Sequence, residues 1–258
     1  MKKIGLCILL LFVPWMVLAE ELPVVCQEFA PYNYLDKDGN VTGASYEIVV
    51  EALKRMNFEP NVKLLPLNRA YETAASGKAA MLFTFSKNPE REKELFFSDG
   101  IIYIEVVFFK RKSDNITWNM LEDVKDYRIG YVDGYYYGST FMEALQQKKF
   151  NKTDAIPASE TVDYQQLTKL TNNRIDLAVC PKTQCTRIIK MYSPELDGVD
   201  YIDKSIGPVR EFYAGFSKKW PNAEALRDQF NEELKKLIAE GTRDNIFKKY
   251  DIAVPENK

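Results

Sequence analysis

Residues 88–99 read NPEREKELFFSD and follow a strand-like apolar run at positions 81–85. Pro89 is expected to break regular structure here and to leave Arg91 in a short polar loop beyond the end of the strand. A guanidinium at this place offers a planar fork of donors that fits a carboxylate in bidentate fashion. We therefore predict that Arg91 anchors a carboxylate. The alternative is a solvated surface arginine within the charged run 90–94.

Upstream of this segment, strand-like and helix-like patterns alternate. Extended runs are predicted at 22–26, 61–65 and 81–85. A stripe of apolar residues at helical spacing predicts a helix from Ser45 to Met56, and a second, shorter helix is expected at 68–76. Strands that alternate with helices in this way favour a largely parallel sheet covered by helices.

Downstream, the same alternation begins again. The strongly β-favouring run 101–110 ends in a polar segment at 111–115, which is expected to cross into a second lobe. A strand at 127–132 and a helix at 139–147 open that lobe, and the extended run 211–216 is expected to return to the first.

These patterns predict an α/β fold of two lobes, each a mostly parallel sheet covered by helices. Lobe 1 is expected to comprise residues 20–110 and a return segment at 206–258, with lobe 2 at 111–205. We expect the lobes to hinge near Lys110–Ser113 and Asp203–Gly207.

Residues 1–19 have the organisation of a secretory signal peptide. Two lysines precede an apolar core at 4–18, and Ala19 provides a small residue for cleavage. The apolar core is short for a membrane span, although a retained anchor is the alternative. We therefore expect a signal peptide that is cleaved after Ala19, and export to the periplasm.

Composition argues against a nucleic-acid or anionic-membrane partner. Removing the leader lowers the count of Lys and Arg from 35 to 33, against 37 Asp and Glu. Such mild acidity lacks the concentrated basic face that these partners need. A hydrophobic fraction of 46% is ordinary for a globular protein. We expect a monomer.

Cysteines remain at positions 26, 180 and 185 after the leader is removed. Cys180 and Cys185 bracket a short loop, and we predict that they can form a disulfide in an oxidising compartment. A zinc site is the alternative, but the chain has no histidine to complete one. Cys26 is expected to pack as a small buried hydrophobe in its strand. We expect neither a metal nor a cofactor.

Six short motifs lie in order along the mature chain. They are Pro31–Tyr34 with Asp38-Gly39 and Gly43, then Ser76-Gly77-Lys78, Pro89-Glu90-Arg91 with Phe97-Ser98-Asp99, Gly130 with Gly134, Arg174-Ile175-Asp176, and Glu240-Gly241-Thr242. Together they resemble the family 3 extracytoplasmic solute-binding proteins, which include the polar amino-acid receptors of ABC importers. The resemblance implies the two-lobed fold of type II periplasmic binding proteins and delivery of a ligand to an inner-membrane ABC permease.

The resemblance also implies that Arg91 grips the α-carboxylate of an amino acid. Candidate partners in the first lobe lie where predicted strands end, since ligands of open α/β sheets bind at such edges. They are Tyr32 and Tyr34 after the first strand, and Thr84, Phe85 and Ser86 after the third. The alternative for the tyrosines is packing in the core.

In the second lobe the chain departs from the amino-acid receptors. Tyr135 stands where those receptors commonly carry a threonine, and no acid stands near Cys180 or Pro181, where the family's aspartate would bind the α-amino group. Losing that contact costs an α-amino acid about 1.5 to 3 kcal/mol. Lys182 favours a second anionic group instead, or is a solvated loop lysine.

Two further features resemble a less characterised branch of the family. Arg69 opens a predicted helix and adds positive potential to the cleft, or pairs with Glu72 on the helix surface. In the tyrosine run 135–137, we expect at least one ring to face the cleft, with Tyr135 and Tyr136 as candidates, or some to pack in the core.

Catalysis is not expected. The chain has no histidine, no glycine-rich phosphate loop and no GxSxG elbow. We therefore predict a periplasmic protein that captures a small carboxylate-bearing ligand between two lobes for an ABC importer. The alternatives are an enzyme on the same scaffold, dehydratase-like or murein-acting, and a protein that presents its ligand to a sensor.

Overall fold

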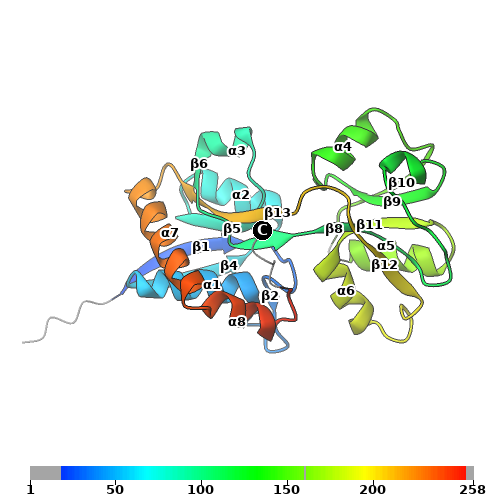
Figure 1. Ribbon diagram of the computed structural model, residues 1–258. Helices are drawn as coiled ribbons and strands as arrows, with labels where there is room; N and C mark the ends of the chain where they lie inside the picture. Colours follow the sequence, from blue (N-terminus) through cyan, green and yellow to red (C-terminus); the bar gives the residue numbers. More distant parts are fainter. Residues whose placement is uncertain (1–18, 160, 254–258) are drawn as a thin grey trace, which may run out of the picture.

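The computed structural model describes residues 19–159 and 161–253. The expected signal peptide therefore lies, except for Ala19, outside the described residues. Two lobes lie side by side, each with its own sheet, and extended chain segments connect them (Figure 1). Within the part of the chain that the structure describes, no helix is long and apolar enough to span a membrane.

The first lobe contains both ends of the described chain. Its elements are β1 (Glu20–Cys26), β2 (Tyr34–Leu35), β3 (Val41–Thr42), α1 (Ala44–Arg55), β4 (Phe58–Leu64), α2 (Leu67–Ala75), β5 (Met81–Phe85), α3 (Pro89–Glu94), β6 (Leu95–Phe97), β7 (Ile102–Ile104), β13 (Arg210–Ser217), α7 (Ala223–Ala239) and α8 (Thr242–Lys249). The main sheet has the order β4-β1-β5-β13-β6, and β7 also pairs with β13.

The second lobe is built from the middle of the chain. Its elements are β8 (Val106–Arg111), the 3₁₀ helix η1 (Leu121–Val124), β9 (Arg128–Asp133), α4 (Ser139–Gln146), β10 (Lys152–Pro157), α5 (Val162–Thr171), β11 (Leu177–Pro181), α6 (Lys182–Met191) and β12 (Val199–Ser205). Its sheet has the order β10-β9-β11-β8-β12.

Both sheets are mixed. In the first, β4, β1 and β5 run parallel and β13 runs antiparallel to its neighbours. In the second, β10, β9 and β11 run parallel and β8 runs antiparallel to β11 and β12. The predicted two-lobed α/β fold is confirmed. The antiparallel strands β8 and β13 each follow a crossing between the lobes. A helical crossover is needed only to join parallel neighbours, so these strands can enter their sheets directly.

The chain passes between the sheets at Glu105, which separates β7 from β8, and again at 206–209. The sequence placed the first crossing at 111–115, yet β8 runs to Arg111 inside the second sheet. The run 101–110 favours β structure throughout, so nothing in its composition marks the break. We therefore propose lobe boundaries at Glu105 and in the 206–209 segment, in place of Lys110 and Ser205.

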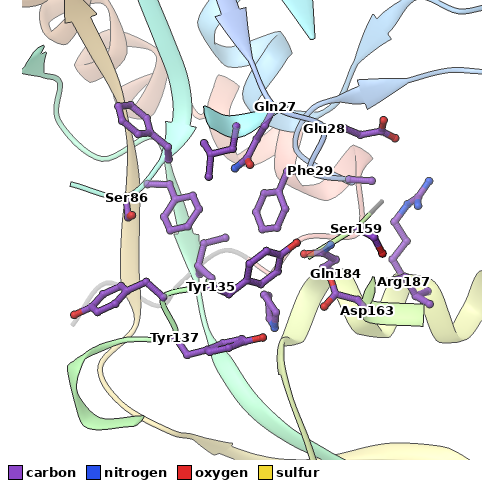
Figure 2. Close-up of a pocket in the computed structure, with 18 of the residues that line it drawn as sticks. Gln27, Glu28, Phe29, Ser86, Tyr135, Tyr137, Ser159, Asp163, Gln184 and Arg187 are labelled. Atoms are coloured by element: carbon purple, nitrogen blue, oxygen red, sulfur yellow. The ribbon is translucent and has the colours of Figure 1, made fainter. Parts of the chain in front are cut away.

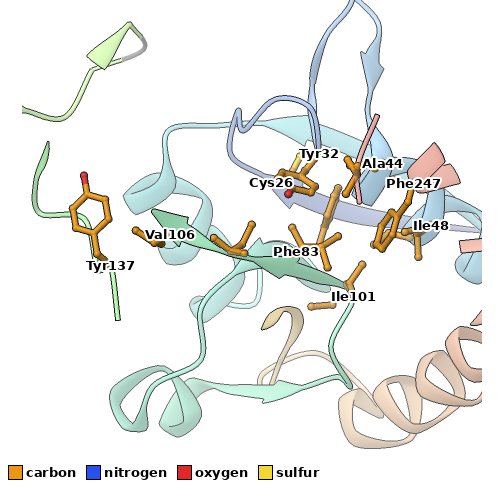
Figure 3. Packing of buried hydrophobic residues seen from close by; sticks show 14 of the residues in the cluster. Cys26, Tyr32, Ala44, Ile48, Phe83, Ile101, Val106, Tyr137 and Phe247 are labelled. Carbon is orange, nitrogen blue, oxygen red and sulfur yellow. The ribbon is translucent and has the colours of Figure 1, made fainter. Parts of the chain in front are cut away.

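The largest cluster of buried hydrophobic residues extends through both lobes, and its first-lobe part lies between the sheet and α1. Cys26 and Phe83 from β1 and β5 are fully buried there, and Ile48 of α1 packs on the same face (Figure 3). The buried positions of α1 follow the helical stripe predicted from the sequence. Burial raises the pKa of the Cys26 thiol to about 12, which agrees with its expected role as a buried hydrophobe.

Asp176, from one of the six motifs, holds elements of the second lobe together. Its carboxylate accepts hydrogen bonds from the Arg128 backbone N–H at 2.9 Å, from Arg128 Nη2 at 2.7 Å and from Arg111 Nη2 at 3.2 Å. The Arg128 guanidinium, with these other donors, lowers the pKa of Asp176 to about 2. The motif therefore joins β8, β9 and the start of β11.

We expect Asp176→Asn to lower the free energy of unfolding by about 2 kcal/mol at neutral pH, because two arginines lose an ionised partner. In the wild-type protein this contribution is complete above the ordinary aspartate value of 3.8 and is lost as pH falls toward about 2. Urea unfolding followed by circular dichroism measures the difference. Asp197→Asn, an exposed change in the same lobe, is the control, and equal effects of the two variants would contradict the assignment.

Candidate functional site

A cavity of about 400 Å³ lies between the lobes and contains Arg91. Parallel strands end at its rim, since residues after β1 and β5 face residues after β9 and β11. From the first lobe it is lined by Gln27, Glu28, Phe29, Phe85, Ser86 and Arg91, and from the second by Tyr135, Tyr136, Tyr137, Asp163, Gln184 and Arg187, with Arg210 and Phe212 where the chain returns (Figure 2).

Arg91 lies in the short helix α3 and not in a loop. Pro89 occupies the first helical position, where a missing N–H costs no helix hydrogen bond. The Asn88 side chain caps the helix by accepting a hydrogen bond of 2.9 Å from the Arg91 backbone N–H. The prediction of a loop was therefore wrong, because Asn-Pro opens this helix and does not interrupt it.

The Arg91 guanidinium is anchored on one side and open on the other. Nη1 donates to the Ser86 carbonyl at 2.6 Å and to Ser86 Oγ at 2.8 Å, and the group lies 5.2 Å from the centre of the Phe85 ring. Nε and Nη2 form no hydrogen bond with any described residue. Burial lowers the pKa of Arg91, but arginine stays protonated in proteins. The open edge therefore has the geometry that binds a carboxylate in bidentate fashion.

Two other arginines reach the cavity from different directions. Arg210, at the start of β13, stacks on the rings of Tyr136 and Phe212 at 5.3 and 5.7 Å, and its buried Nη1 has no hydrogen-bond partner among the described residues. Arg187 of α6 lies 5.0 Å from the centre of the Tyr34 ring. Within residues 19–159 and 161–253, neither of them nor Arg91 forms an ion pair with a carboxylate.

The cavity also contains two carboxylates in different surroundings. Glu28 is exposed, whereas Asp163, in the first turn of α5, is only 4% exposed. Burial raises the pKa of Asp163 to about 6. Burial first, and then the charge of Asp163, raises the pKa of Tyr135 to about 12. With three arginines against two acids, the cavity favours an anionic group on its ligand.

Residues 24–252 match the model of the bacterial extracellular solute-binding proteins, family 3. The chain belongs to this family. It is 23% identical to a probable histidine-binding protein of Neisseria gonorrhoeae over an alignment of 225 residues. The alignment covers 86% of this chain and 80% of the relative. Solved structures share its fold as well, and two serve as examples.

The first of these structures is an ancestral arginine-binding protein bound to arginine, with a TM-score of 0.72 and 20% identity over 90% of this chain and 99% of the other. The second is a histidine kinase sensor domain with similarity to periplasmic binding proteins. It has a TM-score of 0.72 and 18% identity over 90% of this chain and 96% of the other. At these identities the likeness shows the fold alone.

In this family 3 protein, half of the predicted ligand residues meet at the cavity. Arg91, Phe85 and Ser86 form one wall of it, and Tyr135 and Tyr136 lie on another. Tyr137, from the same run, also lines the cavity but is only 5% exposed, and its hydroxyl accepts a hydrogen bond of 2.9 Å from the Val132 N–H. The tyrosine run therefore divides between cleft and core, as the sequence allowed.

Three predicted first-lobe residues lie outside the cavity lining. Tyr32 is 1% exposed and stacks on Phe29, so it belongs to the core. Tyr34 lies in β2 beneath Arg187. Thr84 is fully buried at a φ of 63°, and its carbonyl accepts a hydrogen bond of 3.3 Å from the Gln27 side chain. Proximity to a strand end therefore did not distinguish side chains that line the cavity from those that do not.

Arg69 and Lys182 also lie outside it. Arg69 is exposed on α2, and neither predicted role is observed, since it reaches neither the cavity nor Glu72. Lys182 forms ion pairs with Asp203 at 2.6 Å and Glu105 at 3.3 Å. Because its charge is already balanced at the crossing between lobes, Lys182 does not provide a second anion site in this cavity.

Cys180 and Cys185 form a disulfide, with their Cα atoms 6.3 Å apart. The segment between them is not a loop, because α6 begins at Lys182. The Asp163 carboxylate approaches both sulfur atoms within 4.8 Å. Disulfide sulfurs carry no negative charge, so this cluster does not have the thiolate ligands of a zinc site.

The sequence missed several cavity residues. Gln27 and Glu28 follow the first predicted strand directly, and the rule that ligands bind at strand ends already pointed to them. Gln184 and Arg187 were not identified as cavity residues because the helix that carries them, α6, was not predicted. Asp163 lies in the first turn of α5, where the helix dipole favours acidic residues, so its position in the sequence does not distinguish it. No motif marked it as buried.

Proposed function

We propose that this protein is a periplasmic solute-binding protein that captures a small carboxylate-bearing ligand between its lobes and delivers it to an ABC importer. The single observation that carries the proposal is the Nε and Nη2 edge of Arg91, which has no hydrogen-bond partner among the described residues, on a side chain that lines a cavity between the lobes. The other two arginines add positive potential without carboxylate partners in the described chain. Aromatic rings supply the apolar contact that small-molecule sites use.

The relatives support an amino-acid-like ligand. Membership of the extracellular solute-binding family, and relatives named for binding histidine and arginine, favour a carboxylate attached to a small organic body. The lobes would close on this ligand by motion at Glu105 and the 206–209 segment, since these are the two passages between the sheets in the described part of the chain. A permease would then distinguish the liganded protein from the empty one.

A thermal-shift screen of free acids against their methyl esters tests the proposal. The probes are the twenty common amino acids, succinate, glutarate and the corresponding esters. We expect at least one free acid, at about 100 times its Kd, to stabilise the protein by about 2.7 kcal/mol and its ester to give almost none. Equal stabilisation by acids and esters, or by none of the acids, would contradict a carboxylate site.

Presentation to a sensor is the second candidate, favoured by the fold shared with a histidine kinase sensor domain. Genes for a permease and an ATPase beside the gene for this protein would support transport, and a receptor kinase gene in their place would support sensing.

Mass spectrometry of each stabilising probe after incubation with the protein tests whether the protein is an enzyme. We expect to recover the unchanged compound, and a new product would contradict a binding protein.

A further inference from the structure

Arg210 is a partly buried cation without a partner. It begins β13, directly after the 206–209 crossing, and its side chain lines the cavity. Its Nη1 atom is buried, and within residues 19–159 and 161–253 no hydrogen bond or ion pair reaches its guanidinium. Buried arginines are ordinarily paired or hydrogen-bonded, because an uncompensated buried charge is costly. The structure therefore leaves this guanidinium unsatisfied at the wall of a cavity.

The groups packed against Arg210 hold it in place but do not satisfy it. Its guanidinium carbon lies 5.3 Å from the centre of the Tyr136 ring and 5.7 Å from that of Phe212. The place that a Cβ of Gly138 would occupy lies 3.6 Å from Arg210 Cδ, so this turn packs along the side chain. An aromatic face attracts the cation, but it supplies none of the oxygen acceptors that the N–H groups need. Arg210 is therefore positioned in advance for an anion.

The acids in the cavity lining do not balance this charge. Glu28 is exposed, and burial raises the pKa of Asp163 to about 6. Neither of them forms an ion pair with Arg210 in the described part of the chain. Burial lowers the pKa of Arg210, but arginine stays protonated in proteins. A single ligand carboxylate at Arg91 would therefore leave Arg210 without an anionic partner.

The other cations near the cavity are in different surroundings. Lys182, which the sequence favoured for a second anionic group, is already paired with Asp203 and Glu105. Arg187 has no carboxylate partner among the described residues, but solvent reaches its nitrogen atoms, so water can satisfy them. Arg210 differs from both because a buried N–H group of its guanidinium lacks any acceptor.

We propose that Arg210 binds a second anionic group of the ligand, so that the cleft takes a dicarboxylate with one carboxylate at Arg91 and the other at Arg210. The inference rests on the proposed function for the position of the first carboxylate. A second carboxylate offers two oxygen acceptors to the guanidinium and neutralises its charge at once. The cavity of about 400 Å³ lies in the range that encloses small organic molecules.

Dicarboxylates and their monoamides test this subsite by calorimetry. The pairs are succinate and succinamate, glutarate and glutaramate, and adipate and adipamate. The monoamide keeps the size of the diacid and removes one negative charge, and at about pH 7.5 both carboxylates of the diacid are ionised. Each probe is titrated into the wild-type protein, Arg210→Gln, Arg210→Lys, Arg187→Gln and the exposed control Arg174→Gln.

We expect the wild-type protein to bind at least one diacid about tenfold or more tightly than its monoamide. Arg210→Gln is expected to weaken that diacid about tenfold or more and the monoamide less than about threefold, so that the preference disappears. Arg210→Lys keeps the charge and loses the planar fork, so its preference should be intermediate. Arg174→Gln is expected to match the wild type.

Equal affinity of the wild-type protein for each diacid and its monoamide would overturn the inference, whether or not any variant folds. Equal weakening of both members by Arg210→Gln would also overturn it, because Arg210 would then act on the first carboxylate or on the fold. A selective loss of the diacid in Arg187→Gln alone would assign the second anion to Arg187 instead. In each case the proposed function stands if another free acid binds, and failure of every free acid would overturn both.

Discussion

Arg91→Gln is expected to reduce affinity for the carboxylate-bearing ligand by at least about 100-fold, a loss of about 3 kcal/mol. Glutamine keeps a polar side chain of similar reach but has neither the charge nor the two parallel donors that Nε and Nη2 present to a carboxylate. Arg91→Lys keeps the charge and loses the fork, so we expect an intermediate affinity. Calorimetric titration of the best free acid from the thermal-shift screen measures all three proteins.

The matched control is Arg69→Gln, which removes an arginine of the same lobe that lies exposed on α2 outside the cavity. Its affinity is expected to equal that of the wild type. Arg91 also donates to Ser86, so the melting temperature of the ligand-free variants is measured to separate damage to the fold from loss of the ligand contact. Unchanged affinity in a folded Arg91→Gln protein would refute Arg91 as the anchor.

Much of the fold could be predicted because periodicity and local chemistry decide it. The apolar stripe of α1 and the continuous apolar run of β5 each bury the residues that the pattern marked. Strand β12 and helix α6 were missed because their patterns are mixed, with exposed and half-buried positions along their lengths. The crossing at Glu105 was missed for a different reason. Whether two extended runs belong to one sheet is decided by pairing over long sequence separations, which composition does not encode.

The candidate site was likewise predicted only in part from the sequence. Arg91 was identified by its motif and its place after a strand, and neighbours such as Ser86 followed from chain proximity. Tyr32 and Thr84 lie equally near strand ends, but their orientation is set by packing against the core. Asp163 required the fold itself. Only the packing of α5 beside β11 and α6 turns an ordinary first-turn acid into a buried group at the cavity.

The resemblance led us to expect a carboxylate near Cys180, at the end of β11, and the chain has none there. The structure places the Asp163 carboxylate within 4.8 Å of the Cys180 sulfur, from a neighbouring helix. A carboxylate therefore lies close to this position in space, although none lies there in the sequence. The absence of an acid at Pro181 therefore does not show that the cleft rejects a cationic group.

Asp163→Asn is expected to stabilise the ligand-free protein at about pH 7.5 by about 2 kcal/mol. The folded-state pKa of Asp163 is about 6, above the ordinary value of 3.8. Between these values the folded protein binds more protons than the unfolded chain, so wild-type stability falls as pH rises through this window. Asparagine is close in shape and does not ionise, and the variant therefore avoids this loss. Urea unfolding at intervals from about pH 4 to pH 7.5 measures the difference.

The difference between Asp163→Asn and the wild type should be small near pH 4 and reach its full size above about pH 6.5, whereas Asp197→Asn should show no such dependence. A less stable Asp163→Asn protein at neutral pH would mean that the carboxylate already has a favourable partner in the empty cleft. The expected sign matters for function as well as for stability. A buried side chain whose ionisation destabilises the empty protein does not contribute to folding at neutral pH, as is common for residues that serve a site.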